Sequence, residues 1–105
     1  MKVIKEPLSF DWDDGNINKN FERHLITTNM AEEPFKDRYL LTFPDPSHSK
    51  KEARYNLIGK TKDEDLLFIT YTIRATKIRI ISARVADKKE RKFYEQQKTK
   101  KPTNI

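Results

Sequence analysis

Arginine is the residue type through which this chain could do chemistry, and four arginines fall in strand-like segments: Arg54, Arg74, Arg79 and Arg84. A guanidinium group is permanently charged, and its planar fork of N–H donors matches the oxygens of a phosphate or a carboxylate. Burying such a group without a partner is costly. We therefore expect Arg79, Arg84 or both to emerge where a ligand or a partner docks.

Residues 77–84 form the most strand-like run of the chain, with Ile at three of eight positions and neither Gly nor Pro. Both faces of such a strand would carry apolar residues, which favours a central strand covered on both sides. Residues 66–74 predict its neighbour, joined through a hairpin at residues 75–76. Strict alternation predicts two faces: Ile78, Ile80, Ser82 and Arg84 on one, and Arg79, Ile81 and Ala83 on the other.

Three further segments predict strands, namely residues 8–12, 38–43 and 52–60, with a loop at residues 44–51. In the last strand, alternation places Arg54, Asn56 and Ile58 on one face. The links between consecutive strands are short, and short links favour antiparallel pairing. The predicted class is therefore α+β with an antiparallel β-sheet.

Three helices are expected to pack with this sheet. The first would start at Asp13 or Asp14 and carry an apolar stripe at helical spacing: Ile17, Phe21, His24 and Leu25. A short second helix would be capped by Thr27 or Thr28 and end near Glu33, before Pro34. The third would start at Asp87, which forms a capping-box-like pair with Glu90, and be anchored by Phe93 and Tyr94.

Composition narrows the class of protein. A chain of 105 residues predicts one domain, with a flexible arm at residues 1–7 and a disordered basic tail at residues 96–105. Zero cysteines exclude disulfides and thiolate metal sites, and fit a cytoplasmic protein. No apolar stretch is long enough to span a membrane. The sequence also lacks a Gly-rich phosphate loop, a nucleophile elbow and metal-ligand spacing.

Positive charge is concentrated at the C-terminal end. Residues 1–76 hold 12 Lys and Arg against 13 Asp and Glu, whereas residues 77–105 hold 10 against 3. The net charge of +6 therefore comes entirely from the last third of the chain. This asymmetry is typical of a surface that binds phosphate or an acidic partner, and equally of a solvated helix followed by a basic tail.

The ordered set of motifs between about residues 10 and 95 resembles the BrnT family, the toxins of type II toxin–antitoxin pairs. The run Ile-Arg-Ile-Ile-Ser-Ala-Arg at residues 78–84 and the later Glu-Arg at residues 90–91 carry most of the likeness. The other matching pieces are Phe10-Asp11-Trp12-Asp13, Asn20, Arg23-His24, Phe35, Asp37, Asp45, His48, Glu52-Ala53-Arg54, Ile58-Gly59, Tyr71-Thr72, Arg74, Ala86 and Tyr94.

The sequence departs from the family pattern around the first two helices. Family members typically read Lys-His-Gly after the first helix, whereas this chain reads Arg23-His24-Leu25. A usual Phe of the second helix is replaced by Thr28, and Pro34 interrupts that helix. These changes concern the turn between the helices more than the sheet.

The resemblance implies a RelE/ParE-like fold, with two N-terminal helices on one face of the antiparallel sheet and a C-terminal helix. It also implies a ribonuclease that cuts RNA and arrests translation without a cofactor. The implied partner is a BrnA-like antitoxin with a ribbon-helix-helix portion, through which alone the toxin would reach operator DNA. Neither a metal nor a membrane is implied.

Metal-free RNA cleavage requires a base for the ribose 2′-OH, positive charge at the phosphorane and an acid for the leaving 5′-oxygen. For these tasks we assign Arg54 and Arg84 as catalytic phosphate binders, because strand parity allows them to share a face, provided that the registers of the strands match. His24, His48 and Tyr94 are the candidate acids and bases. The substrate-binding candidates are Arg74, Arg79, Arg23 and Arg91.

Two other functions stay open at this point. ParE-like relatives of the fold inhibit DNA gyrase, so the chain could be a protein-binding inhibitor without catalysis. It could also be a degenerate toxin that survives as an interaction module. A structural role for Arg84, paired with Asp87 or Glu90 and tying the last helix to the strand, is a further alternative.

Overall fold

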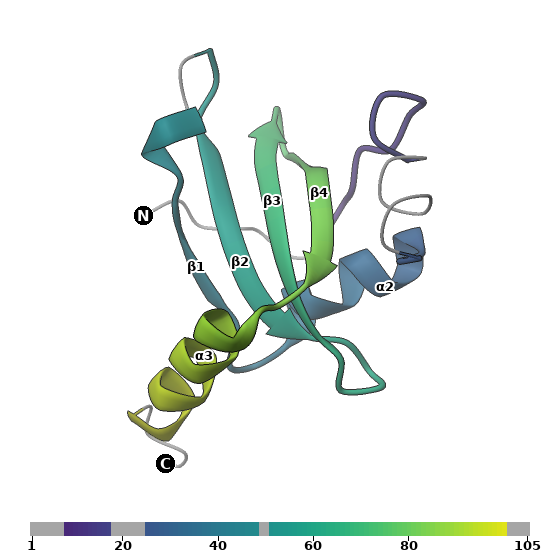
Figure 1. Ribbon diagram of the computed structural model, residues 1–105. Helices are drawn as coiled ribbons and strands as arrows, with labels where there is room; N and C mark the ends of the chain where they lie inside the picture. Colours follow the sequence, from purple (N-terminus) through teal and green to yellow (C-terminus); the bar gives the residue numbers. More distant parts are fainter. Residues whose placement is uncertain (1–7, 18–24, 49–50, 101–105) are drawn as a thin grey trace.

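The chain folds as α+β around one antiparallel sheet, shown in the computed structural model of Figure 1. The structure describes residues 8–17, 25–48 and 51–100. Within them the elements are α2 (Thr28–Glu32), the 3-10 helix η1 (Glu33–Lys36), β1 (Leu41–Pro44), the 3-10 helix η2 (Pro46–His48), β2 (Arg54–Lys60), β3 (Leu66–Arg74), β4 (Lys77–Val85) and α3 (Lys88–Lys100).

The four strands lie in the order β1-β2-β3-β4, and every neighbouring pair is antiparallel. The prediction for β3 is confirmed at both ends, and β4 extends one residue past the predicted end, to Val85. A two-residue connection joins them, in which Ala75 adopts φ 56°. The prediction that residues 77–84 form a central strand is wrong, because β4 lies last in the sheet order.

A β-bulge in β4 overturns the strict alternation predicted for that strand. Tyr71 pairs with Ile80 whereas Thr70 pairs with Ser82, so Ile81 is an extra residue without a partner. Directly opposed residues share a face of the sheet. Ile80 and Ala83 therefore lie on one face and Arg84 on the other, not together with Ile80 as alternation predicted.

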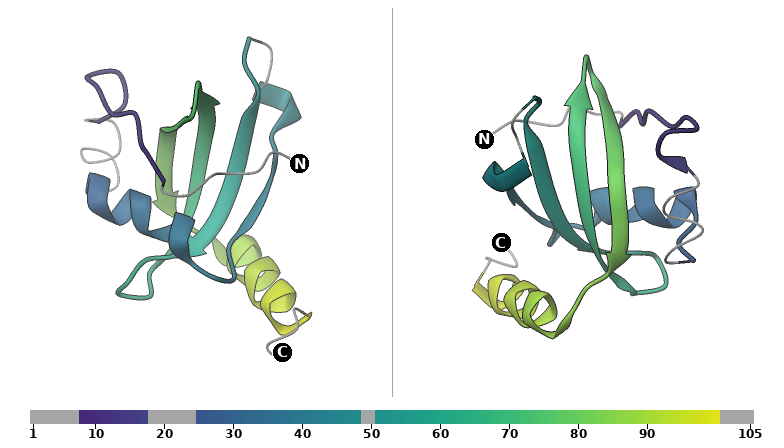
Figure 2. Two further views of the ribbon diagram at one scale, coloured as in Figure 1. Left: turned by 180° about the vertical axis from the view of Figure 1, so that it is seen from behind. Right: turned by 45° about the horizontal axis from the view of Figure 1, so that its top comes forward.

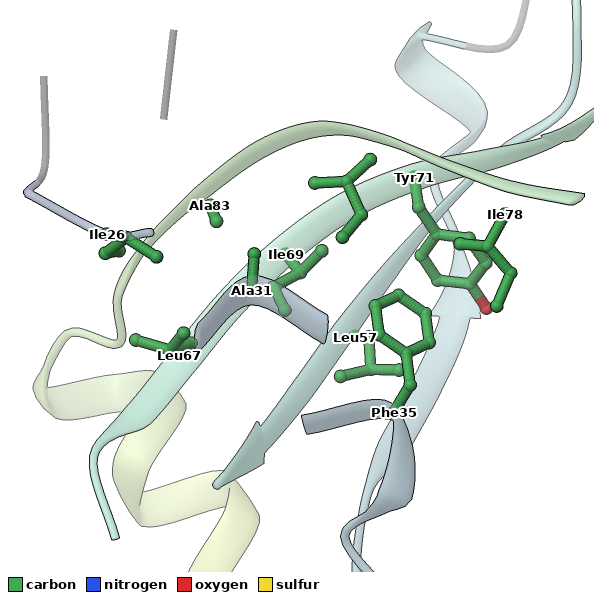
Figure 3. Close-up of a cluster of buried hydrophobic side chains, with 10 residues drawn as sticks. Ile26, Ala31, Phe35, Leu57, Leu67, Ile69, Tyr71, Ile78 and Ala83 are labelled. Carbon is green, nitrogen blue, oxygen red and sulfur yellow. The ribbon is translucent and has the colours of Figure 1, made fainter. Parts of the chain in front are cut away.

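The main core lies on the sheet face covered by α2 and η1, which we call the α2 face. Odd-numbered residues of β2 and β3 meet the two short helices there (Figure 3). The Phe35 ring packs edge-on against both Phe10 and Tyr71, at centroid distances of 5.3 and 5.1 Å. The buried members are Ile26, Ala31, Phe35, Leu57, Leu67, Ile69, Tyr71, Ile78, Ile80 and Ala83.

The N-terminal segment closes the free edge of β4 instead of forming a full strand. Phe10 makes a single parallel bridge with Ile78; the Asp11 amide donates to the Ile78 carbonyl and the Ile78 amide to the Ser9 carbonyl, each at 2.8 Å. The strand predicted at residues 8–12 is thus reduced to one bridge. Apolar residues of this segment, Leu8, Phe10 and Trp12, nevertheless pack against the core.

The helix expected after Asp14 falls largely on residues 18–24, outside the described residues. Its predicted apolar stripe is wrong at Leu25, which is 79% exposed with φ 55°, while Ile26 next to it is buried. The predicted cap of the following helix is confirmed, because the Thr27 hydroxyl accepts from the Met30 amide. Pro34 then tightens the chain into the 3-10 turn η1.

Helix α3 packs on the opposite face, which we call the α3 face, at one end of the sheet (Figure 2). The fully buried Tyr94 joins Ile58, Leu66 and Ala86 in a smaller second core. Asp87 and Glu90 form the predicted capping box: the Asp87 amide donates to Glu90 and the Glu90 amide to Asp87, at 2.9 and 2.8 Å. The helix continues to Lys100, so the residues directly after Glu95 are helical and not a disordered tail.

Candidate functional site

A hollow of about 430 Å³ opens on the α3 face beside the first turn of α3. We call it the polar hollow. It is floored by β2, β3 and β4 and bordered by the residue that follows β1. Its lining residues are Asp45, Arg54, Asn56, Phe68, Thr70, Ile81, Ser82 and Arg84.

The sheet register explains why two distant arginines meet there. Arg54 pairs with Thr72, and Arg84 pairs with Phe68, two strand positions on either side of Thr70. Because Phe68, Thr70 and Thr72 point to one face of β3, the two arginines share that face. The bulge is required for this arrangement, since it turns Arg84 away from the α2 face.

Polar side chains connect β2 and β3 at the floor of the hollow. The Thr70 hydroxyl donates to the Asn56 side-chain oxygen at 2.9 Å, which directs the Asn56 amide nitrogen away from Thr70. At the border, the Asp45 amide donates to the Arg54 carbonyl at 2.8 Å and so extends the β1–β2 pairing by one bond. The Ser47 hydroxyl donates to Oδ1 of Asp45 at 3.0 Å.

Arg84 is held in place from two sides. Its guanidinium donates to both carboxylate oxygens of Glu90, at 2.8 and 2.7 Å, and lies 4.4 Å above the Phe68 ring. The bonds to Glu90 raise the pKa of Arg84 further above its ordinary value. Glu90 is itself fixed by the capping box of α3. The structural alternative considered for Arg84, a tie between strand and helix, is therefore present in the molecule.

This clamp leaves one edge of the Arg84 guanidinium available. Nη1 donates to Glu90 and, at 3.4 Å, to the Val85 carbonyl, while Nη2 donates once, to Glu90. Arginine has five N–H donors in a fixed plane. Nε–H and the second N–H of Nη2 lie on the same edge of that plane, and neither meets an acceptor among the described residues. Two parallel donors of this kind fit two oxygens of a phosphate.

Arg79 lies on the same strand and face but in a different environment. Its guanidinium donates to both oxygens of Asp13, at 3.1 and 2.8 Å, and lies 3.4 Å from Asp11. A Cβ at Gly15 would meet Nη2 of Arg79 at 2.9 Å, so the loop approaches closely only because Gly15 has no side chain. The hydrogen bond from Arg79 lowers the pKa of Asp13. Arg79 does not line the polar hollow.

The buried Asn16 fastens the same loop to the sheet. Its side-chain nitrogen donates to the carbonyls of Asp11 and Ile80, both at 3.0 Å, and its oxygen accepts from the Asp13 amide at 2.8 Å. All of these groups are satisfied within the protein. The carboxylates of the Phe10-Asp11-Trp12-Asp13 motif therefore hold Arg79 in a structural arrangement.

The remaining arginine candidates also lie outside the hollow. Arg74 makes a two-bond ion pair with Glu52, at 3.2 and 3.0 Å, which lowers the pKa of Glu52. Arg91 is exposed on α3. Arg23 and His24 are outside the described residues, as is the side chain of His48.

Tyr94 is placed as a core residue. Its hydroxyl donates to Asp37 at 2.6 Å, and the same carboxylate oxygen accepts from the Lys60 amide at 2.9 Å. Burial and this hydrogen bond raise the pKa of Tyr94 well above its ordinary value. Tyr94 does not line the polar hollow, so we do not carry it forward as an acid or a base.

A larger hollow of about 670 Å³ lies against α2 and η1. Its charges are mixed, because three carboxylates and three lysines contribute to its lining. This balance gives it no general preference for an anion. The charged members are Glu32, Glu33, Asp37, Lys36, Lys60 and Lys62.

Several lining residues were not among the sequence-based candidates: Asp45, Asn56, Thr70 and Ser82. Alternation already placed Asn56 beside Arg54, so that signal was available. Among the described residues there is no group of three His, Cys, Asp or Glu side chains that could hold a metal ion. No helix in this part of the chain is long and apolar enough to cross a membrane.

The fold and the hollow define an α+β protein in which two arginines line one hollow on the face of the sheet. Residues 12–90 match the family model described as "Ribonuclease toxin, BrnT, of type II toxin-antitoxin system". The chain therefore belongs to the BrnT family, and the resemblance seen in the sequence is confirmed. All residues that line the polar hollow fall within the match. No curated protein matches the chain.

Proposed function

We propose that this BrnT-family chain cleaves RNA in the polar hollow, with Arg54 and Arg84 binding the scissile phosphate. The observation that supports the proposal is the free two-donor edge of Arg84 in the hollow that Arg54 also lines. Charge that develops on a phosphorane is stabilised best by donors that are already in position. Glu90 and the Phe68 ring supply that preorganisation for Arg84.

The proposed reaction does not depend on a metal ion. Two permanent positive charges at the phosphate take the place that a cation would otherwise have. Because the reaction removes intact RNA, it would arrest translation. We further propose a RelE/ParE-like arrangement for the whole fold, with the RNA on the α3 face.

The proposed partner is a BrnA-like antitoxin with a ribbon-helix-helix portion, which would also bring the toxin to operator DNA. Carboxylates of such a partner suit the same Arg84 edge that suits phosphate. The antitoxin would then neutralise the toxin in the cytoplasm by competing for the polar hollow. The net charge of +6 favours association with either polyanionic RNA or an acidic partner.

Cleavage of RNA by the purified chain, in the presence of a metal chelator, tests the proposal. Arg54→Ala should lower the cleavage rate by about 100- to 1,000-fold, the usual cost of losing one charge-stabilising donor. Arg91→Ala is the matched control, because Arg91 is exposed on α3 outside the hollow, and it should stay within about threefold.

RNA that stays intact with the folded wild-type chain would contradict the proposal. Inhibition of gyrase under the same conditions would then support the protein-binding alternative. Equal losses for Arg54→Ala and Arg91→Ala would mean that the arginines act only through general charge.

A further inference from the structure

We infer that Asp45 is the general base of the RNA cleavage proposed above, the group that takes the proton from the ribose 2′-OH. This inference rests on the proposed function, because it assigns a role within the polar hollow. Asp45 lies directly after β1 and lines the hollow together with Arg54 and Arg84.

The chemistry of the lining residues points to Asp45. A guanidinium group is protonated near neutral pH and has no acceptor, so neither Arg54 nor Arg84 can take a proton. Asn56 is an amide, and Thr70 and Ser82 carry alcohols, none of which is a base near neutral pH. The two other lining residues are apolar. Among the described residues that line the hollow, Asp45 is the one side chain able to accept a proton.

The backbone around Asp45 fixes its place beside the phosphate-binding arginines. Its amide is bonded to the Arg54 carbonyl, so Asp45 and Arg54 are cross-strand neighbours at the end of the sheet. The Ser47 hydroxyl bonds to Oδ1 from the 3-10 turn η2. A carboxylate at the border of the hollow can therefore reach a ribose whose phosphate is bound at its centre.

Two other carboxylates near this face, Glu90 and Glu52, accept hydrogen bonds from arginines. Both oxygens of Glu90 accept from Arg84, and one also accepts from the Asp87 amide. Both oxygens of Glu52 accept from Arg74. Neither residue lines the polar hollow. Both of these carboxylates hold an arginine in place, and among the described residues that line the hollow Asp45 is the one carboxylate.

The step balances without a further reactant. The Asp45 carboxylate takes the 2′-OH proton while the 2′-oxygen forms a bond to phosphorus. The bond from phosphorus to the 5′-oxygen then breaks, and that oxygen takes a proton from water. The products are a 2′,3′-cyclic phosphate and a 5′-hydroxyl end, and the protonated Asp45 returns its proton to water.

The test uses the full chain and an RNA in which the wild-type cleavage site has been mapped. Asp45→Asn should lower cleavage by about 100- to 10,000-fold, the range expected for loss of a general base. Asp45→Glu should restore part of it. Binding of the same RNA with a 2′-deoxy group at the mapped site should stay within about threefold of wild type, because Asn keeps the shape but not the basicity. Asp63→Asn is the control at an exposed turn.

The pH dependence of cleavage distinguishes Asp45 from His48 as the general base. With Asp45 as the base, the acidic limb of the rate profile disappears in Asp45→Asn. A limb near pH 6.5 that survives in Asp45→Asn and is lost in His48→Gln would overturn the inference.

Two further outcomes would overturn it. In the first, Asp45→Asn cleaves RNA within tenfold of wild type. In the second, Asp45→Asn binds the deoxy-substituted RNA more weakly and also has a lower melting temperature. Both leave the proposed function standing, since wild-type cleavage and the loss in Arg54→Ala are measured in the same series.

Discussion

Arg79 and Arg84 lie on one strand and one face of the sheet, yet they stand in opposite situations. The Arg79 side chain is 9% exposed and is surrounded by Asp11, Asp13 and the backbone of the Gly15 loop. The Arg84 side chain is 39% exposed and has one carboxylate partner, Glu90. Arg79 therefore belongs to a structural ion pair, whereas Arg84, five positions further along the strand, is a candidate binding group.

The two arginines differ in how many of their guanidinium N–H donors are bound by neighbouring groups of the protein. Two carboxylates bind Arg79, and they come from a loop that Asn16 fastens to the sheet edge. Glu90 binds only the far end of Arg84 and leaves the Nε edge without an acceptor among the described residues. An arginine that is oriented but not saturated is the more suitable one for a phosphate.

Between these two arginines, the larger expected effect on cleavage concerns Arg84. Arg84→Ala should cost about 2–4 kcal/mol of transition-state stabilisation, a loss of cleavage of roughly 30- to 1,000-fold. Arg84→Lys should recover only part of this, because an ammonium group cannot make two parallel bonds. RNA cleavage and melting temperature are measured on the same samples.

Glu90→Gln is the matched control for Arg84→Ala. It breaks the charged pair and weakens the tie between β4 and α3, but it leaves the donor edge of Arg84 in the hollow. We expect Glu90→Gln to lower the melting temperature about as much as Arg84→Ala does. Its loss of cleavage should stay below about tenfold. Equal cleavage losses for the two variants would mean that Arg84 acts through the fold alone.

A smaller effect, of the opposite kind, is expected at Arg79. Arg79→Ala leaves Asp11 and Asp13 facing the sheet edge without their cation and should lower the melting temperature by about 5 °C or more. Cleavage at a temperature where the variant is folded should stay within about threefold. Should cleavage fall as far as in Arg84→Ala while the melting temperature holds, Arg79 would belong to the substrate site, as the sequence predicted.

The features predicted from the sequence are those with local causes. The bounds of β3, the Thr27 cap and the Asp87–Glu90 capping box depend on residues close together in the chain, and all three are observed. The bulge at Ile81 depends on how β4 pairs with β3, which alternation within one segment does not reveal.

The candidate site was predicted in part for the same reason. Arg54 and Arg84 were identified by residue type and by the family motif, and the register brings them to one hollow. The structural role of Arg79 could not be read from the sequence, because its partner Asp13 lies 66 residues away along the chain. Asp45 was missed as a candidate because its loop gave no periodic signal, although the family motif includes it.

The smallest expected effect is a gain in stability at Leu25, away from both arginines. Leu25 has φ 55°, a left-handed conformation that glycine adopts readily and leucine does not, and family members carry glycine there. Its side chain is 79% exposed, so its removal gives up little buried apolar area. Leu25→Gly should therefore stabilise the fold by about 0.5–1 kcal/mol, after the greater freedom of glycine in the unfolded chain is counted. The melting temperature should rise by about 3–6 °C with cleavage unchanged, whereas Leu25→Ala, which keeps the strained φ, should give no gain. A rise with both variants would attribute the effect to the exposed apolar side chain instead of the backbone.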